Sequence, residues 1–253
     1  MEKGVLPVAY RFDFDEVFDE DYLYFYSLFL TDEQSDREVG VIWRLLELEP
    51  GMEVLDLACG HGRIANRLAA RGCRVTGLDA SDHFLSLARA EAETRGLPVA
   101  YHHGDMRSLP WTGRFDRVIS WFTAFGYFED DDDNRRVLAE AYRALKPGGR
   151  LLIDHQNLLR IAANWQRSIV WERDGDFLID HNAYDPLSGR SHTQRIVIRG
   201  SRVRRMHYSI RMFTLRELAD WLRQAGFREV AGYGAEGEPL TVQSRRMIAV
   251  ATK

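Results

Sequence analysis

From residue 51 onward, short apolar runs alternate with segments whose apolar residues recur every three to four positions. The runs predict strands, and the spaced segments predict helices. The predicted order is strand at about 52–57, helix 61–71, strand 73–79, helix 82–95, strand 98–102, strand 115–121, helix 131–145 and strand 149–155. This alternation is typical of an α/β fold with a doubly wound, mostly parallel sheet.

The pattern changes after Asn157 to long stretches in which polar and apolar residues alternate. Antiparallel strands are therefore expected at 161–205, inserted into a core of residues 51–160 and 206–253. A helix is predicted from Thr214 as N-cap to Gly226, followed by the two closing strands of the core.

Residues 1–50 precede the core and contain two helix candidates. One is aromatic, at about 15–30, and the other is amphipathic, at 34–48. We interpret the segment as a helical lid. The acidic run at 129–134 predicts capping and favourable charge at a helix N-terminus.

Composition narrows the class of protein. The 253 residues are 45% hydrophobic and carry a formal net charge of −4, so no global field attracts nucleic acid or anionic lipid. The two cysteines, Cys59 and Cys73, have no zinc-site spacing, so no metal is expected. Without a signal-peptide pattern or an apolar run of membrane-spanning length, a cytoplasmic protein with no membrane contact is expected.

The loop after the first strand reads Gly60-His-Gly62-Arg-Ile-Ala65, and an acid, Asp79, lies 19 residues past Gly60. Alone, this spacing fits a dinucleotide fingerprint, so an NAD-linked oxidoreductase or epimerase is one interpretation. However, Asp56 places a carboxylate where a pyrophosphate would approach, and two anions would repel each other. A ligand with an ammonium group and no phosphate would instead be satisfied there.

Five motifs occur in order: "VLDLACGHG" at 54–62, the acid closing strand two, "GD" at 104–105, "FD" at 115–116 and "LKPGG" at 145–149. With them the sequence resembles the class I S-adenosylmethionine-dependent methyltransferases. The resemblance implies a Rossmann-like sheet of seven strands with an antiparallel last strand, and S-adenosyl-L-methionine as cofactor. The expected cofactor-binding residues are Ala58, Gly60, Gly62, Asp79, Ala80, Gly104, Asp105, Met106, Ser120 and Trp121. Arg37 is a further candidate, for the cofactor carboxylate, although a solvated helix face explains it as well.

The stretch "IDHQN" at 153–157 resembles that of glycine N-methyltransferase and its relatives, and antibiotic amino-sugar N-methyltransferases look similar in general plan. His155 follows strand five at the ligand-binding edge of the sheet. It is a candidate base or substrate contact, and a hydrogen-bonded structural role is equally open. From the aromatic segments, Tyr10 and Phe125 are the other candidate catalytic residues, with core packing as the alternative.

Arginines alternate with apolar residues in the inserted strands, which fits either an RNA-binding face or an ordinary solvated one. Strand four lacks the Asn/Asp-Pro-Pro-aromatic signature of enzymes that methylate base amino groups, so no nucleic-acid partner is expected. The expected substrate is a small molecule, and an amine nitrogen is favoured over an oxygen as the atom that is methylated. A homo-oligomer built through the inserted strands or the N-terminal segment is also expected. A catalytically silent binding protein with the same fold is a further alternative.

Overall fold

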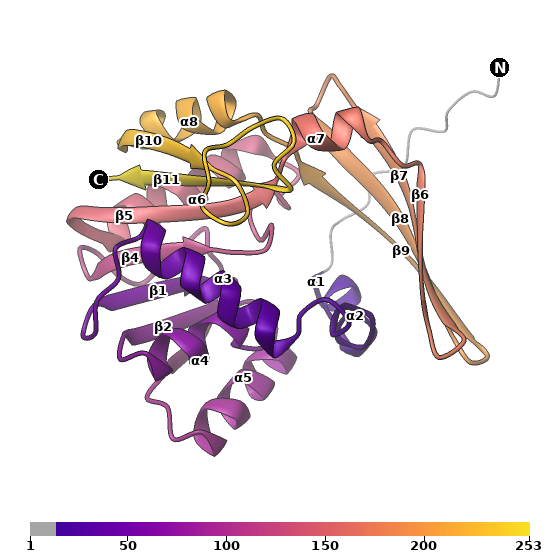
Figure 1. Ribbon diagram of the computed structural model, residues 1–253, viewed down its shortest axis with the longest axis horizontal. Coiled ribbons are helices and arrows are strands. Elements are labelled where there is room, and N and C mark those ends of the chain that lie inside the picture. Colours follow the sequence, from indigo (N-terminus) through magenta and orange to yellow (C-terminus); the bar gives the residue numbers. More distant parts are fainter. Residues whose placement is uncertain (1–13) are drawn as a thin grey trace.

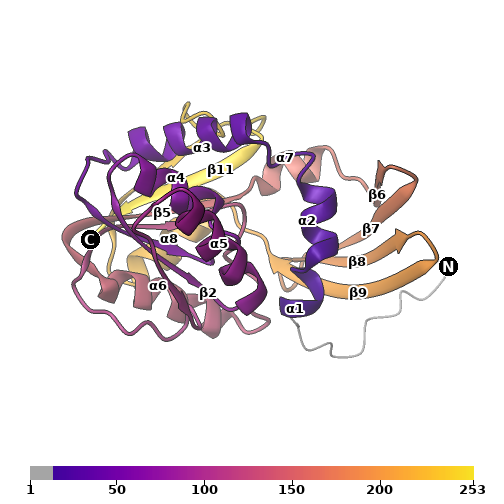
Figure 2. The ribbon, with the colours of Figure 1, turned by 90° about the horizontal axis from the view of Figure 1, so that it is seen from below.

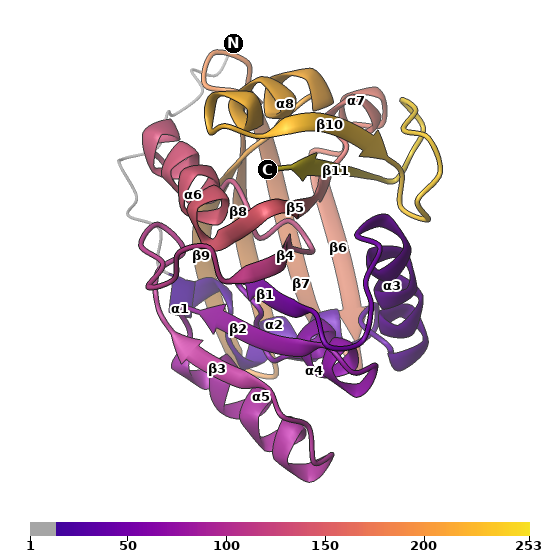
Figure 3. The ribbon, with the colours of Figure 1, turned by 90° about the vertical axis from the view of Figure 1, so that its left-hand side faces the viewer.

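A seven-stranded sheet forms the centre of the molecule. The computed structural model describes residues 14–253, except for the side chain of Asp15. Across the sheet the strands are β10 (Arg228–Tyr233), β11 (Arg246–Thr252), β5 (Leu145–Gln156), β4 (Phe115–Ser120), β1 (Glu53–Leu57), β2 (Arg74–Asp79) and β3 (Ala100–His103). Only β11 runs antiparallel to its neighbours (Figure 3). The predicted fold is confirmed, and its strand order reverses between β1 and β4, where doubly wound sheets bind ligands.

Helices cover both faces of this sheet. They are α3 (Asp32–Leu45), α4 (Arg63–Ala70), α5 (Asp82–Thr94), α6 (Asp131–Ala144) and α8 (Leu215–Gln224). The apolar residues of α3 and α4 belong to one core cluster, and those of α6 and α8 belong to another. With both faces covered, the central strands β1, β2, β4 and β5 are mostly buried, whereas the edge strands β3 and β10 are more exposed. In the described part of the chain, no helix combines the length and apolarity needed to cross a bilayer.

Side-chain caps set where these helices begin. The hydroxyl of Thr214 accepts a hydrogen bond from the backbone N–H of Glu217 at 3.2 Å, so the predicted N-cap is confirmed. Asp130 caps α6 by accepting from the N–H of Asp132 at 2.8 Å. The acidic run therefore acts at a helix N-terminus, as predicted.

The aromatic N-terminal segment forms two short helices rather than the single one predicted at about 15–30. They are α1 (Phe14–Val17) and α2 (Glu20–Tyr26). The chain breaks between them because Asp19 is extended and its carboxylate accepts from the N–H of Tyr22 at 3.0 Å, which starts a new helix. The second prediction, a helix at 34–48, corresponds to α3, which begins two residues earlier behind the cap Thr31.

A second sheet of four antiparallel strands stands beside the core (Figure 1). Its strands are β6 (Ser168–Arg173), β7 (Asp176–Asp185), β8 (Arg190–Arg199) and β9 (Arg202–Arg211). The short helix α7 (Leu158–Ala163), which the sequence pattern did not predict, leads into it. Because β9 pairs with β8 along its whole length, the boundary expected between residues 205 and 206 falls inside this strand.

The helices α1 and α2 lie against the second sheet, on its core-facing side (Figure 2). Phe25 packs there among the buried residues of the sheet, including Leu178 and Met206. Asp21 is 1% exposed and accepts from Arg199 at 2.8 Å and Arg202 at 2.6 Å. Arg204 donates to the same carboxylate at 2.7 Å, so three arginines of the second sheet neutralise this buried charge and anchor α2 to the sheet.

Gly62, which precedes α4, is a position where the fold demands glycine. Its φ is +80°, and an added Cβ would overlap the hydroxyl of Tyr101 and come within 2.9 Å of the Cβ of Ala88. Gly96 has a similar φ of +63° but open space around it. Substituting alanine at each of the two glycines therefore separates the energetic cost of backbone strain from that of overpacking.

We expect Gly96→Ala to lower the free energy of unfolding by roughly 1–2 kcal/mol, the cost of the left-handed backbone. Gly62→Ala should cost a further 1–3 kcal/mol or so because the added methyl has no room. Urea titration of both variants measures the difference. Equal losses would show that α4 adapts freely to the added group.

Candidate active site

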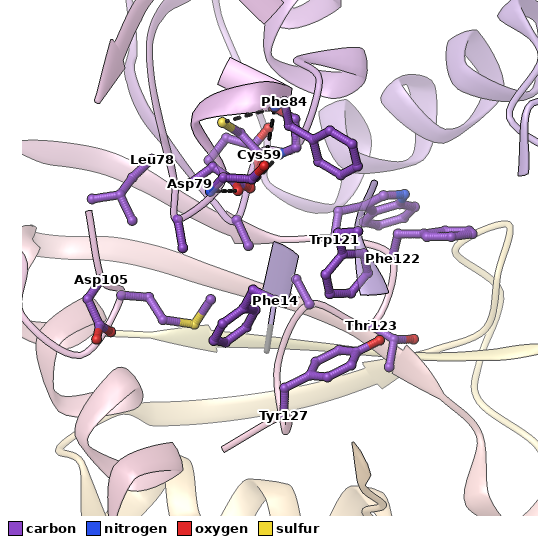
Figure 4. A pocket seen from close by; sticks show the side chains of 18 of the residues that line it. Phe14, Cys59, Leu78, Asp79, Phe84, Asp105, Trp121, Phe122, Thr123 and Tyr127 are labelled. Carbon is purple, nitrogen blue, oxygen red and sulfur yellow. Dashed lines mark hydrogen bonds between the residues drawn. The ribbon is translucent and has the colours of Figure 1, made fainter. Parts of the chain in front are cut away.

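A cavity of about 800 Å³ opens at the carboxyl ends of β1, β2 and β4, a volume typical of small-molecule sites. Core residues line one side of it, and residues from α1, α2 and β9 line the other. Figure 4 shows Asp79 and Asp105 around the same space as Trp121, Phe122 and Tyr127. The cavity thus lies between the core and the second sheet with its lid.

The loop after β1 is held in place by the acid that closes β2. The N–H of Gly60 donates to Asp79 Oδ2 at 2.7 Å, and the N–H of Ser81 donates to Oδ1 at 2.9 Å. Ala58 and Gly60 have φ values of 56° and 55°, so the chain turns sharply here. Burial raises the pKa of Asp79, and the backbone hydrogen bonds oppose that rise. Asp79 also lines the cavity.

Asp56 is the most unusual charge of the cavity wall. It is 2% exposed, and its Oδ2 has no hydrogen-bond partner among the described residues. Burial, together with the neighbouring Asp79, raises its pKa to about 7, although Arg63 opposes the rise. An unpartnered buried carboxylate is costly, so this oxygen is suited to a cationic ligand group.

Arg63 lies beside Asp56 on the first turn of α4. Its Nη1 donates to Glu38 Oε2 at 2.5 Å and to Ser35 Oγ at 3.1 Å. Glu38 also accepts from the indole N–H of Trp121 at 2.9 Å. This buried network joins α3, α4 and the end of β4 behind the cavity.

Asp105 lies at the other end of the cavity, after β3. Its carboxylate accepts from Arg107 at 2.6 Å, and Arg107 also pairs with Asp133. Partial burial would raise the pKa of Asp105, but the hydrogen bonds from Arg107 hold it below its usual value. Met106 and Gly104 line the cavity next to it.

The structure brings most of the predicted cofactor-binding residues together. The eight that line the cavity are Ala58, Gly60, Asp79, Ala80, Gly104, Asp105, Met106 and Trp121. Gly62 does not line the cavity, and the hydroxyl of Tyr101 packs closely against it. Ser120 is buried within β4. Arg37 is exposed on α3, where it donates to Gln34, so it does not reach the cavity.

Two of the three predicted catalytic residues lie away from the cavity. His155 is fully buried, its Nδ1 lies 3.1 Å from the carbonyl of Gln156, and its ring packs edge-on against Phe213. Phe125 is 1% exposed and stacks on the same Phe213. Neither residue lines the cavity. Tyr10 lies outside the described residues.

Many cavity residues were not among the sequence-predicted site residues, and four polar examples are Arg63, Gln156, Tyr208 and Arg246. A signal existed for Gln156, because it follows His155 on a strand and side chains alternate between the faces of a sheet. The other three are brought in by tertiary packing from α4, β9 and β11.

Comparison with known proteins identifies the family. A family model described as a methyltransferase domain matches residues 54–149. YqeM of Bacillus subtilis (strain 168), described as a methyltransferase, is 30% identical over 83% of this chain and 88% of its own. The chain belongs to the class I S-adenosylmethionine-dependent methyltransferases. The glycine/sarcosine N-methyltransferase of Parasynechococcus marenigrum (strain WH8102) is 35% identical over 51% of this chain and 46% of its own.

Solved structures agree on the fold. The methyltransferase CcbJ of Streptomyces caelestis superposes with a TM-score of 0.77 at 22% identity, covering 91% of this chain and 95% of that one. The protein is therefore an enzyme with S-adenosylmethionine as cofactor, and the dinucleotide and silent-binder alternatives are set aside. The unpartnered oxygen of Asp56 fits this cofactor, which carries an ammonium group and no phosphate.

We expect affinity for S-adenosylhomocysteine to rise with pH, because the ammonium group needs ionised Asp56. With a pKa of about 7, affinity should grow roughly eightfold between pH 6 and pH 7.5. Asp56→Asn should bind more weakly at pH 7.5 and lose this dependence. Calorimetry measures both proteins, and an unchanged pH dependence in the variant would contradict the assignment.

His155 gives a second pH prediction. Burial lowers the pKa of His155 from 6.5 to about 4. Between these pH values the histidine is protonated in the unfolded chain but neutral in the folded protein. The folded protein should therefore lose stability as the pH falls from 6.5 to 4, by up to roughly 3 kcal/mol from this residue. His155→Phe fills the same space and should lose less. Parallel pH curves of thermal unfolding for the two proteins would show that His155 is not a buried neutral base.

Proposed function

We propose that this enzyme transfers a methyl group from S-adenosylmethionine to a small-molecule acceptor, and that the accepting atom is an amine nitrogen rather than an oxygen. The observation that carries the proposal is the make-up of the cavity beyond the nucleotide loop. That part is mainly aromatic, with rings from Phe14, Phe18, Tyr22, Tyr26, Tyr127 and Tyr208, and the carboxylates of Glu129 and Asp130 that also line the cavity are exposed to solvent.

Residues of the core side are suited to the cofactor. Asp56 is placed to accept from its ammonium group, and Arg63 beside it offers a positive charge to its carboxylate, the role first expected of Arg37. The carboxylate of Asp79, which lines the cavity, suits the ribose hydroxyls as an acceptor. Asp105 suits the adenine amino group, with Met106 against the ring. When bound, the cofactor supplies an activated methyl group, so positioning supplies much of the catalysis.

Residues of the lid and second sheet are suited to the acceptor. Tyr22 and Tyr26 stack with ring centroids 4.2 Å apart, and both line the cavity with Tyr208. Arg195 donates to the hydroxyls of Tyr26 at 3.0 Å and Tyr208 at 2.9 Å, while Asp180 neutralises it. The rings are thereby fixed, and aromatic faces attract a cation such as a methylated amine.

The tyrosines themselves are poor bases. Burial raises the pKa of Tyr22, Tyr127 and Tyr208 above the ordinary value of 10. A hydroxyl acceptor would have to lose its proton during attack, but a neutral amine attacks through its lone pair and loses its proton to water afterwards. The aromatic part of the cavity therefore favours an amine nitrogen as the methyl acceptor. Names of relatives do not decide this, since they include N- and O-methyltransferases.

The ion pairs made by arginines of the inserted strands also support a small-molecule acceptor rather than a nucleic acid. Arg190 pairs with Asp131 and Arg195 with Asp180. Arg199 and Arg202 pair with Asp21 of the lid. Because these charges are committed to ion pairs within the molecule, they do not form a free basic face for nucleic acid.

Several expectations stay predictions. They are the division into a lid, a core and an inserted unit, the cytoplasmic location, and a homo-oligomer through the second sheet. For the oligomer, the face of this sheet turned away from the lid exposes Val170 by 56%.

Incubation with S-adenosylmethionine and panels of small amines, phenols and alcohols tests the proposal, with S-adenosylhomocysteine measured by mass spectrometry. We expect product formation with amines. Asp79→Ala should bind S-adenosylhomocysteine more weakly by roughly 1.5–3 kcal/mol and lower turnover at limiting cofactor. Asp82→Ala, an exposed neighbour, is the matched control. Turnover confined to phenols or alcohols would contradict the preference for nitrogen.

A further inference from the structure

The turn that follows β4 adopts a backbone conformation that is unfavourable for its residues. Phe122 and Thr123 have φ values of 60° and 59°, in the left-handed region. Bulky and β-branched residues rarely adopt this region, and such strain persists only where surrounding groups enforce it. Both residues line the cavity together with Trp121, so the strained turn is part of the active-site wall.

One buried side chain, Asp154 of β5, enforces this turn. Its Oδ2 accepts from the N–H of Phe122 at 2.8 Å, and its backbone carbonyl accepts from the N–H of Thr123 at 3.0 Å. Asp154 is 1% exposed. It therefore holds two consecutive strained residues from the neighbouring strand, one through its side chain and one through its backbone.

Arg246 of β11 completes the arrangement. Its Nε and Nη2 donate to the two oxygens of Asp154 at 2.9 and 2.6 Å, and the same Nη2 donates to Thr123 Oγ1 at 2.6 Å. Arg246 neutralises the buried carboxylate and binds the turn directly. The three residues form a closed network under the cavity wall.

The turn lies where the two parts of the cavity meet. The ring of Phe122 lies 5.6 Å from the guanidinium of Arg63 on the cofactor side and 6.3 Å from the ring of Tyr26 on the acceptor side. A shift of the turn would therefore change how the two substrates face each other. Methyl transfer is an in-line displacement and is sensitive to that alignment.

We propose that Asp154 is a positioning residue for methyl transfer, which acts by holding the strained Phe122–Thr123 turn at the junction of the cofactor and acceptor parts of the cavity. It touches neither substrate. The inference rests on the proposed function for its effect on rate, but its effect on the turn is independent of what the acceptor is.

The test uses Asp154→Ala alone and combined with Thr123→Gly or Thr123→Ala. Both substitutions at 123 remove the hydroxyl that binds Arg246, but only glycine adopts a positive φ without strain. If Asp154 works by enforcing the turn, glycine should compensate for its loss and alanine should not. The comparison separates this role from a general loss of packing.

Two readouts are measured on the full chain. The first is the indole N–H signal of Trp121 in the complex with S-adenosylhomocysteine, assigned with Trp121→Phe. The second is kcat and KM with the amine found in the acceptor screen. We expect Asp154→Ala to move the indole signal and to lower kcat by about 10²-fold, with affinity for S-adenosylhomocysteine nearly unchanged. Thr123→Gly should restore the signal and recover at least about tenfold in kcat, whereas Thr123→Ala should restore neither.

A wild-type indole signal in Asp154→Ala, or equal behaviour of the glycine and alanine double variants, would overturn the proposal. If Asp154→Ala does not fold, recovery of the folded protein by Thr123→Gly alone supports it, and failure of both double variants overturns it. Should no acceptor be found, the indole signal still decides the role of Asp154, so failure of the proposed function is recognised separately.

Discussion

The burial of one carboxylate, Asp56, is the constraint around which the site is organised. Its neighbours are charged too, but each has protein partners: Asp79 has backbone N–H groups, Asp105 has Arg107, and Glu38 has Arg63. Asp56 alone of these keeps an oxygen without a partner. The fold tolerates this cost at the strand-order reversal, where backbone and side chains converge on a ligand. Under the proposed function, this unpartnered oxygen is the acceptor for the cofactor's ammonium group.

The rest of the cavity depends on how the lid is attached. Asp21 secures α2 to the β8–β9 hairpin, and Phe25 packs into the same sheet. The aromatic face formed by Tyr22 and Tyr26 therefore belongs structurally to the second sheet, although it is close in sequence to the core. Residues more than 180 positions apart, Tyr22 and Tyr208, consequently line one chamber. In the proposed function this arrangement separates the two tasks, with the cofactor on the core side and the acceptor on the side of α1, α2 and the second sheet.

The sequence was sufficient to predict those features of the structure that depend on neighbouring residues. The strand–loop–helix pattern predicted the sheet, and fixed spacing predicted that Gly60 and Asp79 lie at the cavity. It was insufficient where two residues of one type differ only in tertiary surroundings. Arg37 and Arg63 are both near helix starts, yet the first is solvated and the second is buried beside Asp56. Likewise, a glycine that makes room for a ligand and one that makes room for Tyr101 look the same in a motif.

The stretch at 153–157 shows how this limit arises within a single strand. A histidine is a natural candidate for catalysis because its side chain titrates near neutral pH. In a strand, however, neighbouring side chains point to opposite faces of the sheet. His155 points into the packed core against Phe213, and Gln156 lines the cavity. Asp154 makes its contacts to the turn after β4, because β4 and β5 are paired in parallel and end at the same edge. β5 thus contributes to the active site through Gln156, which lines the cavity, and through Asp154, which holds the turn beside it.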